Sequence, residues 1–299
     1  MNKIPLIGDD FVREDIFSVI NNNSYKFSKG QRAIAAYINE FYEKAAFMTA
    51  NRLGKTVGVS ESTVVRFAME LGFEGYPAMQ KALQDMVMNR LTSVQRIEVA
   101  NDRLGDQDVL SMVIQSDMEK LRQTAETVNR EDFDTVVNEI LKARRVYILG
   151  SRSTGVLASF LGHYLRHMLE SVHVVTSPGA SEMFEQIIGV GAEDVVIAFS
   201  FPRYSSATFK GAQFCRTTGA KVVGITDSAL SPLGRTSDYV LLCKSDMISL
   251  VDSLTAPMSI ANALIVAIAA RRERELQKTF ASLEKVWEEY QVYEKRVDG

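Results

Sequence analysis

The chain has 299 residues, 46% hydrophobic and 24% charged, a composition typical of globular proteins, and its length predicts about two domains. The formal net charge of −3 excludes a uniformly basic protein, and two cysteines, Cys215 and Cys243, are too few for a disulfide framework or a zinc site. The longest apolar run, residues 260–270, is shorter than the roughly 20 residues that span a bilayer, and the polar stretch 8–14 is unlike a secretory signal. We therefore expect a cytoplasmic protein without membrane association.

The first third of the chain predicts helices only. Residues 21–24, Asn-Asn-Asn-Ser, are expected to form a loop. Ser28 should begin the next helix, because Gln31 lies three residues later and completes a capping box. The apolar face of this helix comprises Ile34, Tyr37, Ile38 and Phe41.

Residues 49–73 predict two short helices joined by a tight turn. Leu53 and Val57 give the first helix an apolar stripe, Gly58 suits the left-handed conformation that ends a helix, and Ser60 is a good N-cap for the second. The inward face of the second helix recurs at helical spacing and comprises Val64, Phe67, Ala68 and Leu71.

The opposite face of the second helix carries small polar groups at its start and an arginine one turn later, which suits a helix laid into a DNA major groove. The alternative is a helical hairpin that binds nothing. We favour a helix-turn-helix because turn glycine, cap and exposed polar start coincide. The expected DNA contacts are Lys55, Ser60, Glu61, Ser62, Thr63 and Arg66, with Lys29 and Arg32 on phosphates.

The distribution of charge agrees with DNA binding by this part of the chain. Residues 26–90 contain nine Lys or Arg and six acidic residues, a net charge of +3, which leaves −6 for the rest. Pro77 fits the first turn of a further helix that runs through Val87. The polar stretch 91–105 predicts an interdomain connector, and residues 106–128 and 132–142 again look helical.

After Arg144 the pattern changes to short β-branched runs separated by helix-length segments. This alternation predicts an α/β fold, a doubly wound five-stranded parallel sheet in the order 2-1-3-4-5. The expected strands are residues 145–149, 172–176, 194–200, 221–226 and 238–243, and the expected helices between them are residues 154–170, 181–188 and 205–218. A final helix is expected over residues 256–293, broken near Lys278. The predicted domains are residues 1–90 for DNA binding, 91–125 as linker and connecting helix, and 126–299 for the sheet.

Two loops should meet at the carboxyl edge of this sheet, where the strand order reverses. Residues 150–155 and 200–208 are rich in hydroxyl groups, carry one arginine each, and lead into helix N-termini, which favours phosphate binding. Alternatively, these hydroxyl groups only cap helices. Neither loop has the glycine spacing of a nucleotide fingerprint. The expected ligand contacts are Ser151, Arg152, Ser153, Thr154, Ser200, Arg203 and Ser205.

Residues suited to catalysis or metal binding are few. His163 and His167 lie four apart on one predicted helix, but His173 begins a strand and offers no third ligand, so we expect packing roles and no metal or other cofactor. Glu182 is the best candidate for a catalytic base near the crevice. Such a glutamate more often complements a helix dipole, and we expect no catalytic residue.

The stretch from Ser60 to Tyr76, followed by a sheet domain of this type, resembles the RpiR family of bacterial transcription regulators, in which a helix-turn-helix precedes a sugar isomerase (SIS) domain. The resemblance covers residues 27–270. It implies a dimeric or tetrameric repressor or activator that binds an operator in double-stranded DNA. It also implies that the SIS domain senses a phosphorylated sugar and that the regulated genes serve sugar uptake or catabolism.

The two loops depart from the pattern that this resemblance implies. In the family pattern Gly-x-Gly-x-Ser, Gly150 matches the first glycine, Arg152 replaces the second, and Thr154 takes the serine position. In the family pattern Ser-x-Ser-Gly-x-Thr, Ser200 matches the first serine and Ser205 takes the threonine position. Pro202 replaces the second serine and Arg203 replaces the glycine. One interpretation is a more anionic effector, such as a sugar acid phosphate. Another is that the arginines reach a partner subunit.

Three functions follow from these residues. The leading hypothesis is a DNA-binding regulator of sugar metabolism genes, controlled by a phosphorylated sugar. The alternative is a phosphosugar isomerase with an accessory helical domain, which would need a base at the crevice. The third is an interaction module whose helical part binds protein.

Overall fold

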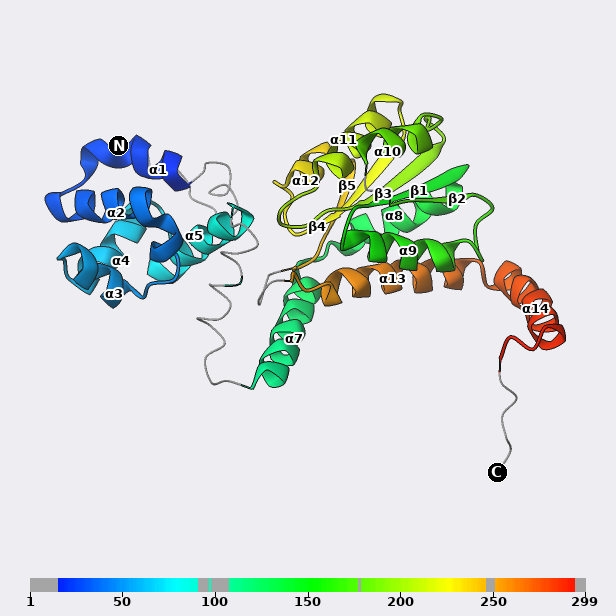
Figure 1. Cartoon of the computed structure of the whole chain (residues 1–299). Helices are drawn as coiled ribbons and strands as arrows, with labels where there is room; N and C mark the ends of the chain where they lie inside the picture. Colours follow the sequence, from blue (N-terminus) through cyan, green and yellow to red (C-terminus); the bar gives the residue numbers. More distant parts are fainter. Residues whose placement is uncertain (1–15, 91–96, 98–107, 177–178, 246–250, 294–299) are drawn as a thin grey trace. The chain divides into compact units, whose positions relative to one another are not determined.

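The computed structural model describes residues 16–90, 97, 108–176, 179–245 and 251–293. The chain forms two compact units, Met1–Arg103 and Leu104–Gly299, each described by itself below (Figure 1). The polar stretch 8–14 lies outside the described residues, and so does the predicted connector 91–105 apart from Ile97. Among the helices that the structure describes, none is both long and apolar enough to cross a bilayer.

The first unit is helical in its described part. Its elements are α1 (Ile16–Asn23), a 3-10 helix η2 (Ser24–Lys26), α2 (Lys29–Ala45), α3 (Ala50–Val57), α4 (Glu61–Glu70) and α5 (Tyr76–Arg90). Their apolar faces share one core, in which Ile34, Leu53 and Phe67 are fully buried. The capping box at Ser28 and Gln31 is confirmed.

The expected loop at residues 21–24 is wrong. Helix α1 continues through Asn23, whose side-chain amide donates a hydrogen bond of 2.9 Å to the carbonyl of Val19. This bond is a local contact between a side chain and the backbone carbonyl four residues earlier, in the last turns of α1.

The second unit is built around five parallel strands in the order β2-β1-β3-β4-β5, as predicted. Two helices precede the sheet, α7 (Val109–Thr127) and α8 (Arg130–Lys142). The strands are β1 (Arg145–Gly150), β2 (Val172–Val175), β3 (Asp194–Phe199), β4 (Lys221–Thr226) and β5 (Tyr239–Leu242). All six residues of β3 are buried, which explains the continuous apolar run in its sequence.

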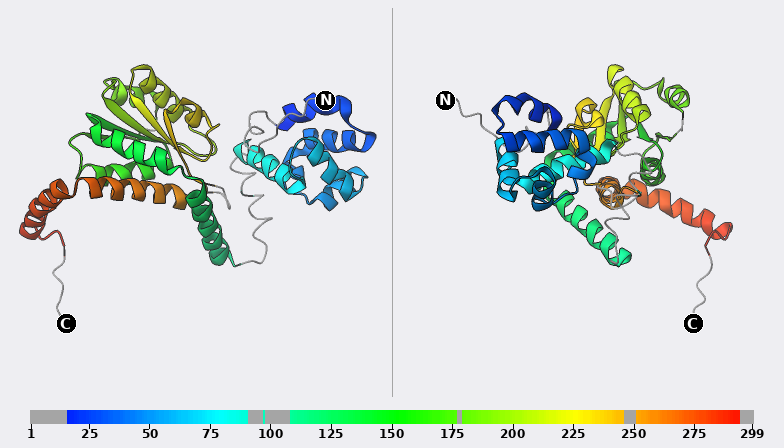
Figure 2. Two further views of the ribbon diagram at one scale, coloured as in Figure 1. Left: turned by 180° about the vertical axis from the view of Figure 1, so that it is seen from behind. Right: turned by 60° about the vertical axis from the view of Figure 1, so that its left-hand side comes forward.

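Helices cover both faces of this sheet (Figures 1 and 2). Val146, Ile148 and Ile197 face a core shared with α8, α9 (Thr154–Leu165) and α13 (Thr255–Arg271). The alternate residues, including Tyr147, Leu149 and Val196, face the second core. That core is completed by α10 (Ala180–Ile187), α11 (Ser206–Thr217) and α12 (Pro232–Thr236).

The predicted break near Lys278 is wrong. Helix α13 ends at Arg271 and α14 (Glu273–Glu289) follows, so the break lies at Arg272. The guanidinium of Arg272 donates a hydrogen bond of 2.7 Å to the carbonyl of Met168, which ties the break to the segment after α9. No glycine or proline marks this position in the sequence, so no local pattern predicts the break there. Helix α9 also ends at Leu165, five residues earlier than expected, and α12 was not predicted.

Candidate effector pocket and DNA-reading helix

The turn between α3 and α4 has the predicted geometry. Gly58 ends α3 in the left-handed conformation with φ of 74°, and the Ser60 hydroxyl accepts a hydrogen bond from the Thr63 amide at the start of α4. Sequence reasoning missed Gly54. A Cβ at Gly54 would lie 2.8 Å from the carbonyl oxygen of Val59, so glycine is needed for α3 to approach the turn this closely.

The start of α4 presents the predicted polar groups. Glu61, Ser62 and Arg66 are exposed, and the Arg66 Nε donates to the Ser62 carbonyl over 3.4 Å. Thr63 is half-buried, with its hydroxyl 2.8 Å from that of Ser60. The exposed positions therefore form a polar surface at the N-terminal turns of α4.

Neighbouring helices extend this surface. Lys55 on α3 is exposed, as are Lys29 and Arg32 on α2. A Cβ at Gly30 would lie 3.1 Å from a methyl group of Val59, which shows that the first turn of α2 lies against the helix-turn-helix turn. The Asn51 side-chain amide on α3 donates a hydrogen bond of 3.1 Å to Glu61. Asn51 was missed because it belongs to the other helix, ten residues earlier.

The two loops predicted to meet at the carboxyl edge of the sheet do meet. The hydroxyl oxygen of Ser151, just after β1, lies 3.0 Å from that of Thr208 in α11. The Thr208 amide in turn donates to the Ser205 hydroxyl over 3.2 Å. We call these three residues the hydroxyl chain; its first link joins two hydroxyl groups, its second runs from a backbone amide to a hydroxyl, and together they connect the loop after β1 with the loop after β3.

A cavity of about 780 Å³ opens beside this hydroxyl chain. Its lining residues are Ser151, Arg152, Gly155, Val156, Ser159, Thr176, Ser205 and Ala207. Three of the predicted contacts, Ser151, Arg152 and Ser205, are among them. Thr176 was missed although it follows directly after β2, at the same edge of the sheet, and Ser159 was missed because it lies inside α9, beyond the loop.

The other predicted contacts, Ser153, Thr154, Ser200 and Arg203, are not among the lining residues of this cavity. The Thr154 hydroxyl accepts from the Ser151 amide over 3.0 Å and donates to the Ser151 carbonyl over 2.9 Å, so it holds the loop in shape. Ser153 is exposed and forms no side-chain cap for α9. Ser200 is buried, and its hydroxyl has no hydrogen-bond partner among the described groups. Arg203 is exposed.

A second tie holds the loop after β3 to the end of β4. The phenol of Tyr204 donates to both carboxylate oxygens of Asp227, over 3.0 and 3.1 Å, and the Thr226 hydroxyl donates to the same carboxylate over 3.2 Å. Sequence reasoning did not single out Tyr204 or Asp227. Three strand ends, those of β1, β3 and β4, are thereby joined by side-chain hydrogen bonds at one edge.

Both loops hold an arginine in the left-handed backbone region. The φ angle is 59° at Arg152 and 63° at Arg203. An L-residue with a Cβ pays about 1–2 kcal/mol for this conformation, whereas glycine adopts it freely. These are the two positions at which the family pattern given above has glycine. The two loops therefore have a backbone conformation that suits glycine, although this chain has arginine at both positions.

The cavity lining contains no acid–base group suited to catalysis among the described residues, since Arg152 is its one ionisable side chain. Glu182 lies exposed in the first turn of α10, outside that lining. The His163 and His167 rings are 5.3 Å apart, and the His167 ring lies 5.6 Å from that of Phe280. Within the described ranges, no three potential metal ligands come together.

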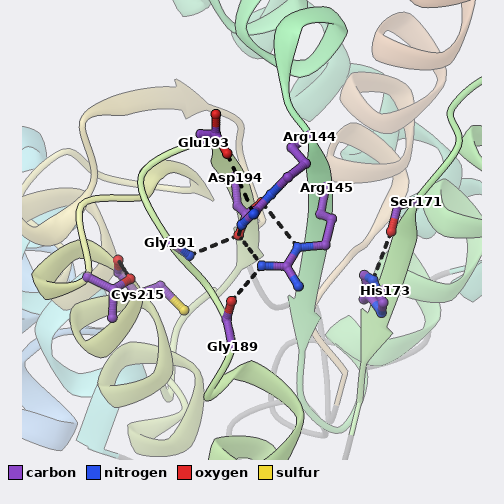
Figure 3. A network of polar contacts seen from close by, with 10 residues as sticks. Arg144, Arg145, Ser171, His173, Gly189, Gly191, Glu193, Asp194 and Cys215 are labelled. Atoms are coloured by element: carbon purple, nitrogen blue, oxygen red, sulfur yellow. Dashed lines mark hydrogen bonds and ion pairs between the residues drawn. The ribbon is translucent and has the colours of Figure 1, made fainter.

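The opposite edge of the sheet carries a closed network of charges (Figure 3). Asp194 begins β3 with a buried side chain, and it accepts hydrogen bonds from Arg144 (3.0 Å), Arg145 (2.8 Å) and the Gly191 amide (2.9 Å). Burial alone would raise the pKa of Asp194, but the hydrogen bonds from Arg145, Arg144 and Gly191 outweigh it and lower the pKa from 3.8 to about 2.

Comparison with known proteins places both units. Residues 15–90 match the helix-turn-helix domain of the rpiR family, and residues 139–267 match the SIS domain. The chain belongs to the RpiR family. It is therefore a transcriptional regulator with an RpiR-type helix-turn-helix and a SIS domain.

Relatives of this RpiR-family chain agree with that assignment. An uncharacterized HTH-type transcriptional regulator of Clostridium perfringens is 23% identical, over 76% of this chain and 80% of its own length. The sugar isomerase domain of an RpiR transcription factor from Sphaerobacter thermophilus is 24% identical with a TM-score of 0.57, covering 60% of this chain and 99% of that one. NanR of Vibrio vulnificus, complexed with ManNAc-6P, is 18% identical with a TM-score of 0.56, covering 91% and 97%. The two solved structures show that the fold is shared.

Proposed function

We propose that this RpiR-family regulator binds a specific operator in double-stranded DNA and that a phosphorylated sugar in the SIS domain controls this binding. The observation that carries the proposal is the hydroxyl chain from Ser151 through Thr208 to Ser205, which joins two loops beside a cavity. We also propose, from the resemblance to this family, that the regulated genes serve sugar metabolism and that the protein acts in the cytoplasm.

The chemistry of the cavity suits a phosphorylated sugar. Ser151, Ser159, Thr176 and Ser205 supply hydroxyl groups that match those of a sugar. The N-termini of α9 and α11 lie at the two loops, and unpaired backbone N–H groups at helix starts favour phosphoryl oxygens. The ManNAc-6P bound by NanR of Vibrio vulnificus, a protein of the same fold, supports this class of ligand.

The polar start of α4 is the proposed reading surface. Arg66, Ser62 and Glu61 would contact base edges, and Lys55, Lys29 and Arg32 would contact phosphates. The bond from Asn51 would fix the Glu61 carboxylate, which can accept from the amino group of cytosine. A homodimer or homotetramer is proposed because two such helices must reach major grooves about 34 Å apart.

The described lining of the cavity supports sensing rather than catalysis. Aldose–ketose isomerisation needs a carboxylate or histidine base beside the substrate, and the described lining offers neither. An isomerase assay over a panel of sugar phosphates tests this point, and turnover abolished by Glu182→Gln would favour the enzyme instead.

The decisive experiment starts from an operator selected by the full-length protein from random duplexes. Effector control is then measured as the shift in operator affinity with each neutral or acidic sugar phosphate, for which coupling of about 5–150-fold is expected. The double variant Ser159→Ala with Thr176→Val removes two cavity hydroxyls that bond no other described group, and should lose the shift while retaining operator binding. Ser259→Ala with Ser282→Ala, exposed serines on α13 and α14, is the matched control.

Arg66→Ala should abolish selection of the operator while the thermal unfolding curve stays unchanged, because Arg66 is exposed. An unaltered footprint with this variant would remove Arg66 from the reading surface. If the effector still shifts operator affinity in the variant that lacks the two cavity hydroxyls, the effector does not bind in this cavity as proposed.

A further inference from the structure

Two helix starts open on the cavity, and they differ in their polar groups. The start of α11 is capped by the Ser205 hydroxyl, which accepts from the Thr208 amide, and Ser205 and Ala207 line the cavity. The start of α9 has no side-chain cap, and Arg152 stands before it. Each helix has 12 residues, so each start can attract an anion.

Arg152 is the one ionisable side chain among the described lining residues. Its guanidinium is exposed and, within the described structure, makes no hydrogen bond or ion pair with another residue. The described lining also lacks a carboxylate that would neutralise it. Since its backbone is held at φ of 59°, the chain maintains this cation at a cost in conformational energy.

Resting on the proposed function, we propose that Arg152 binds a carboxylate of the effector, which is therefore a phosphorylated sugar acid. The phosphoryl group occupies the hydroxyl-rich start of α11, and the carboxylate lies at the start of α9 beneath the Arg152 guanidinium. A planar guanidinium and a carboxylate form paired, charge-assisted hydrogen bonds, which a neutral sugar end cannot match.

The test compares two ligands that differ only at the end of the carbon chain. Calorimetric titration of the full-length protein uses 6-phosphogluconate and glucitol 6-phosphate, in which a carboxylate is replaced by a primary alcohol. The wild type should prefer 6-phosphogluconate by about tenfold or more, as expected of a charge-assisted pair.

Arg152→Gln should reduce this preference to less than about threefold, with little change in affinity for glucitol 6-phosphate. Arg152→Asn is a second variant, chosen because asparagine tolerates the left-handed backbone region well. It should reduce the preference for 6-phosphogluconate to the same extent as Arg152→Gln. Arg166→Gln is the matched control, an exposed arginine that follows α9 and lies outside the described cavity lining. It should preserve the preference.

Equal affinity of the wild type for the two ligands would overturn the inference and leave the proposed function intact. If Arg152→Gln lost affinity for both ligands by the same factor, the inference would also be overturned, because Arg152 would then bind the phosphoryl group that the two ligands share. No binding of either ligand, together with no effect of any neutral sugar phosphate on operator affinity, would overturn both proposals.

Discussion

The two edges of the central sheet use arginine in opposite ways. At the amino edge, Arg144 and Arg145 converge on the buried carboxylate of Asp194, and the charges are neutralised within the fold. At the carboxyl edge, Arg152 borders a cavity that has no carboxylate in its described lining. The difference teaches that two charge arrangements can serve different ends: the closed network can stabilise the fold, whereas Arg152 is left available for the ligand that we propose.

Removing the carboxylate at the amino edge should have the largest effect. Asp194→Ala leaves two arginines without their shared partner, and the free energy of unfolding should fall by about 3 kcal/mol, the lower end of the range because Arg144 is half exposed. Urea denaturation measures it. Glu193→Ala is the control, since Glu193 is exposed and lies 3.5 Å from Arg144. If Asp194→Ala costs no more than Glu193→Ala, the network does not stabilise the fold.

Acid should weaken the same edge over a defined pH range. The pKa of Asp194 is lowered in the fold to about 2, so the stabilisation is complete above its unfolded pKa of about 4 and is lost as the pH falls toward 2. The shift corresponds to about 2 kcal/mol. The difference in free energy of unfolding between the wild type and Asp194→Asn, measured by urea denaturation, should therefore decrease by that amount when the pH is lowered from 5 to 2. A constant gap would contradict the assignment of this pKa.

The hydrogen bonds at the carboxyl edge should contribute less. Tyr204→Phe removes the donor to Asp227 and should lower the free energy of unfolding by about 1 kcal/mol. Tyr239→Phe, a half-buried tyrosine at the start of β5, is the control in the same urea titration. Equal values for the two variants would mean that the tie between the β3 loop and β4 adds nothing.

The smallest expected change in the free energy of unfolding is a gain, from replacing Arg152 by glycine. Arg152→Gly relieves the left-handed strain but adds freedom to the unfolded chain, so a net gain of about 0.5 kcal/mol is expected from thermal unfolding. Arg166→Gly, at a φ of −61°, gains no such relief and should lose stability. A loss of stability in Arg152→Gly would show that this arginine serves the fold, as the arginines of the amino edge do.

Much of this fold could be predicted from the sequence because local patterns agree with it. The turn glycine Gly58, the cap Ser60 and the β-branched runs each specify an element through nearby residues. The break at Arg272 could not be predicted, since no glycine or proline marks it and the contact made there is with Met168, more than one hundred residues earlier.

The cavity lining could be predicted only in part, namely where its residues lie in loops that the sequence pattern marks. Ser151, Arg152 and Ser205 lie in loops that the strand order brings together. Ser159 and Thr176 enter the lining from a helix and from the end of a neighbouring strand, where no loop pattern draws attention to them. Thr154 has the right chemistry, but its hydroxyl is engaged by the backbone of Ser151.

The positive φ angles at Arg152 and Arg203 have an evolutionary consequence. Because glycine also adopts this backbone shape, a single substitution can add or remove an arginine in either loop while the loop backbone keeps its conformation. With Arg152 in the role that we propose, ligand preference and loop backbone would be separable traits in this SIS domain. On that proposal, related regulators would change their effector through one residue in the loop and keep the same fold.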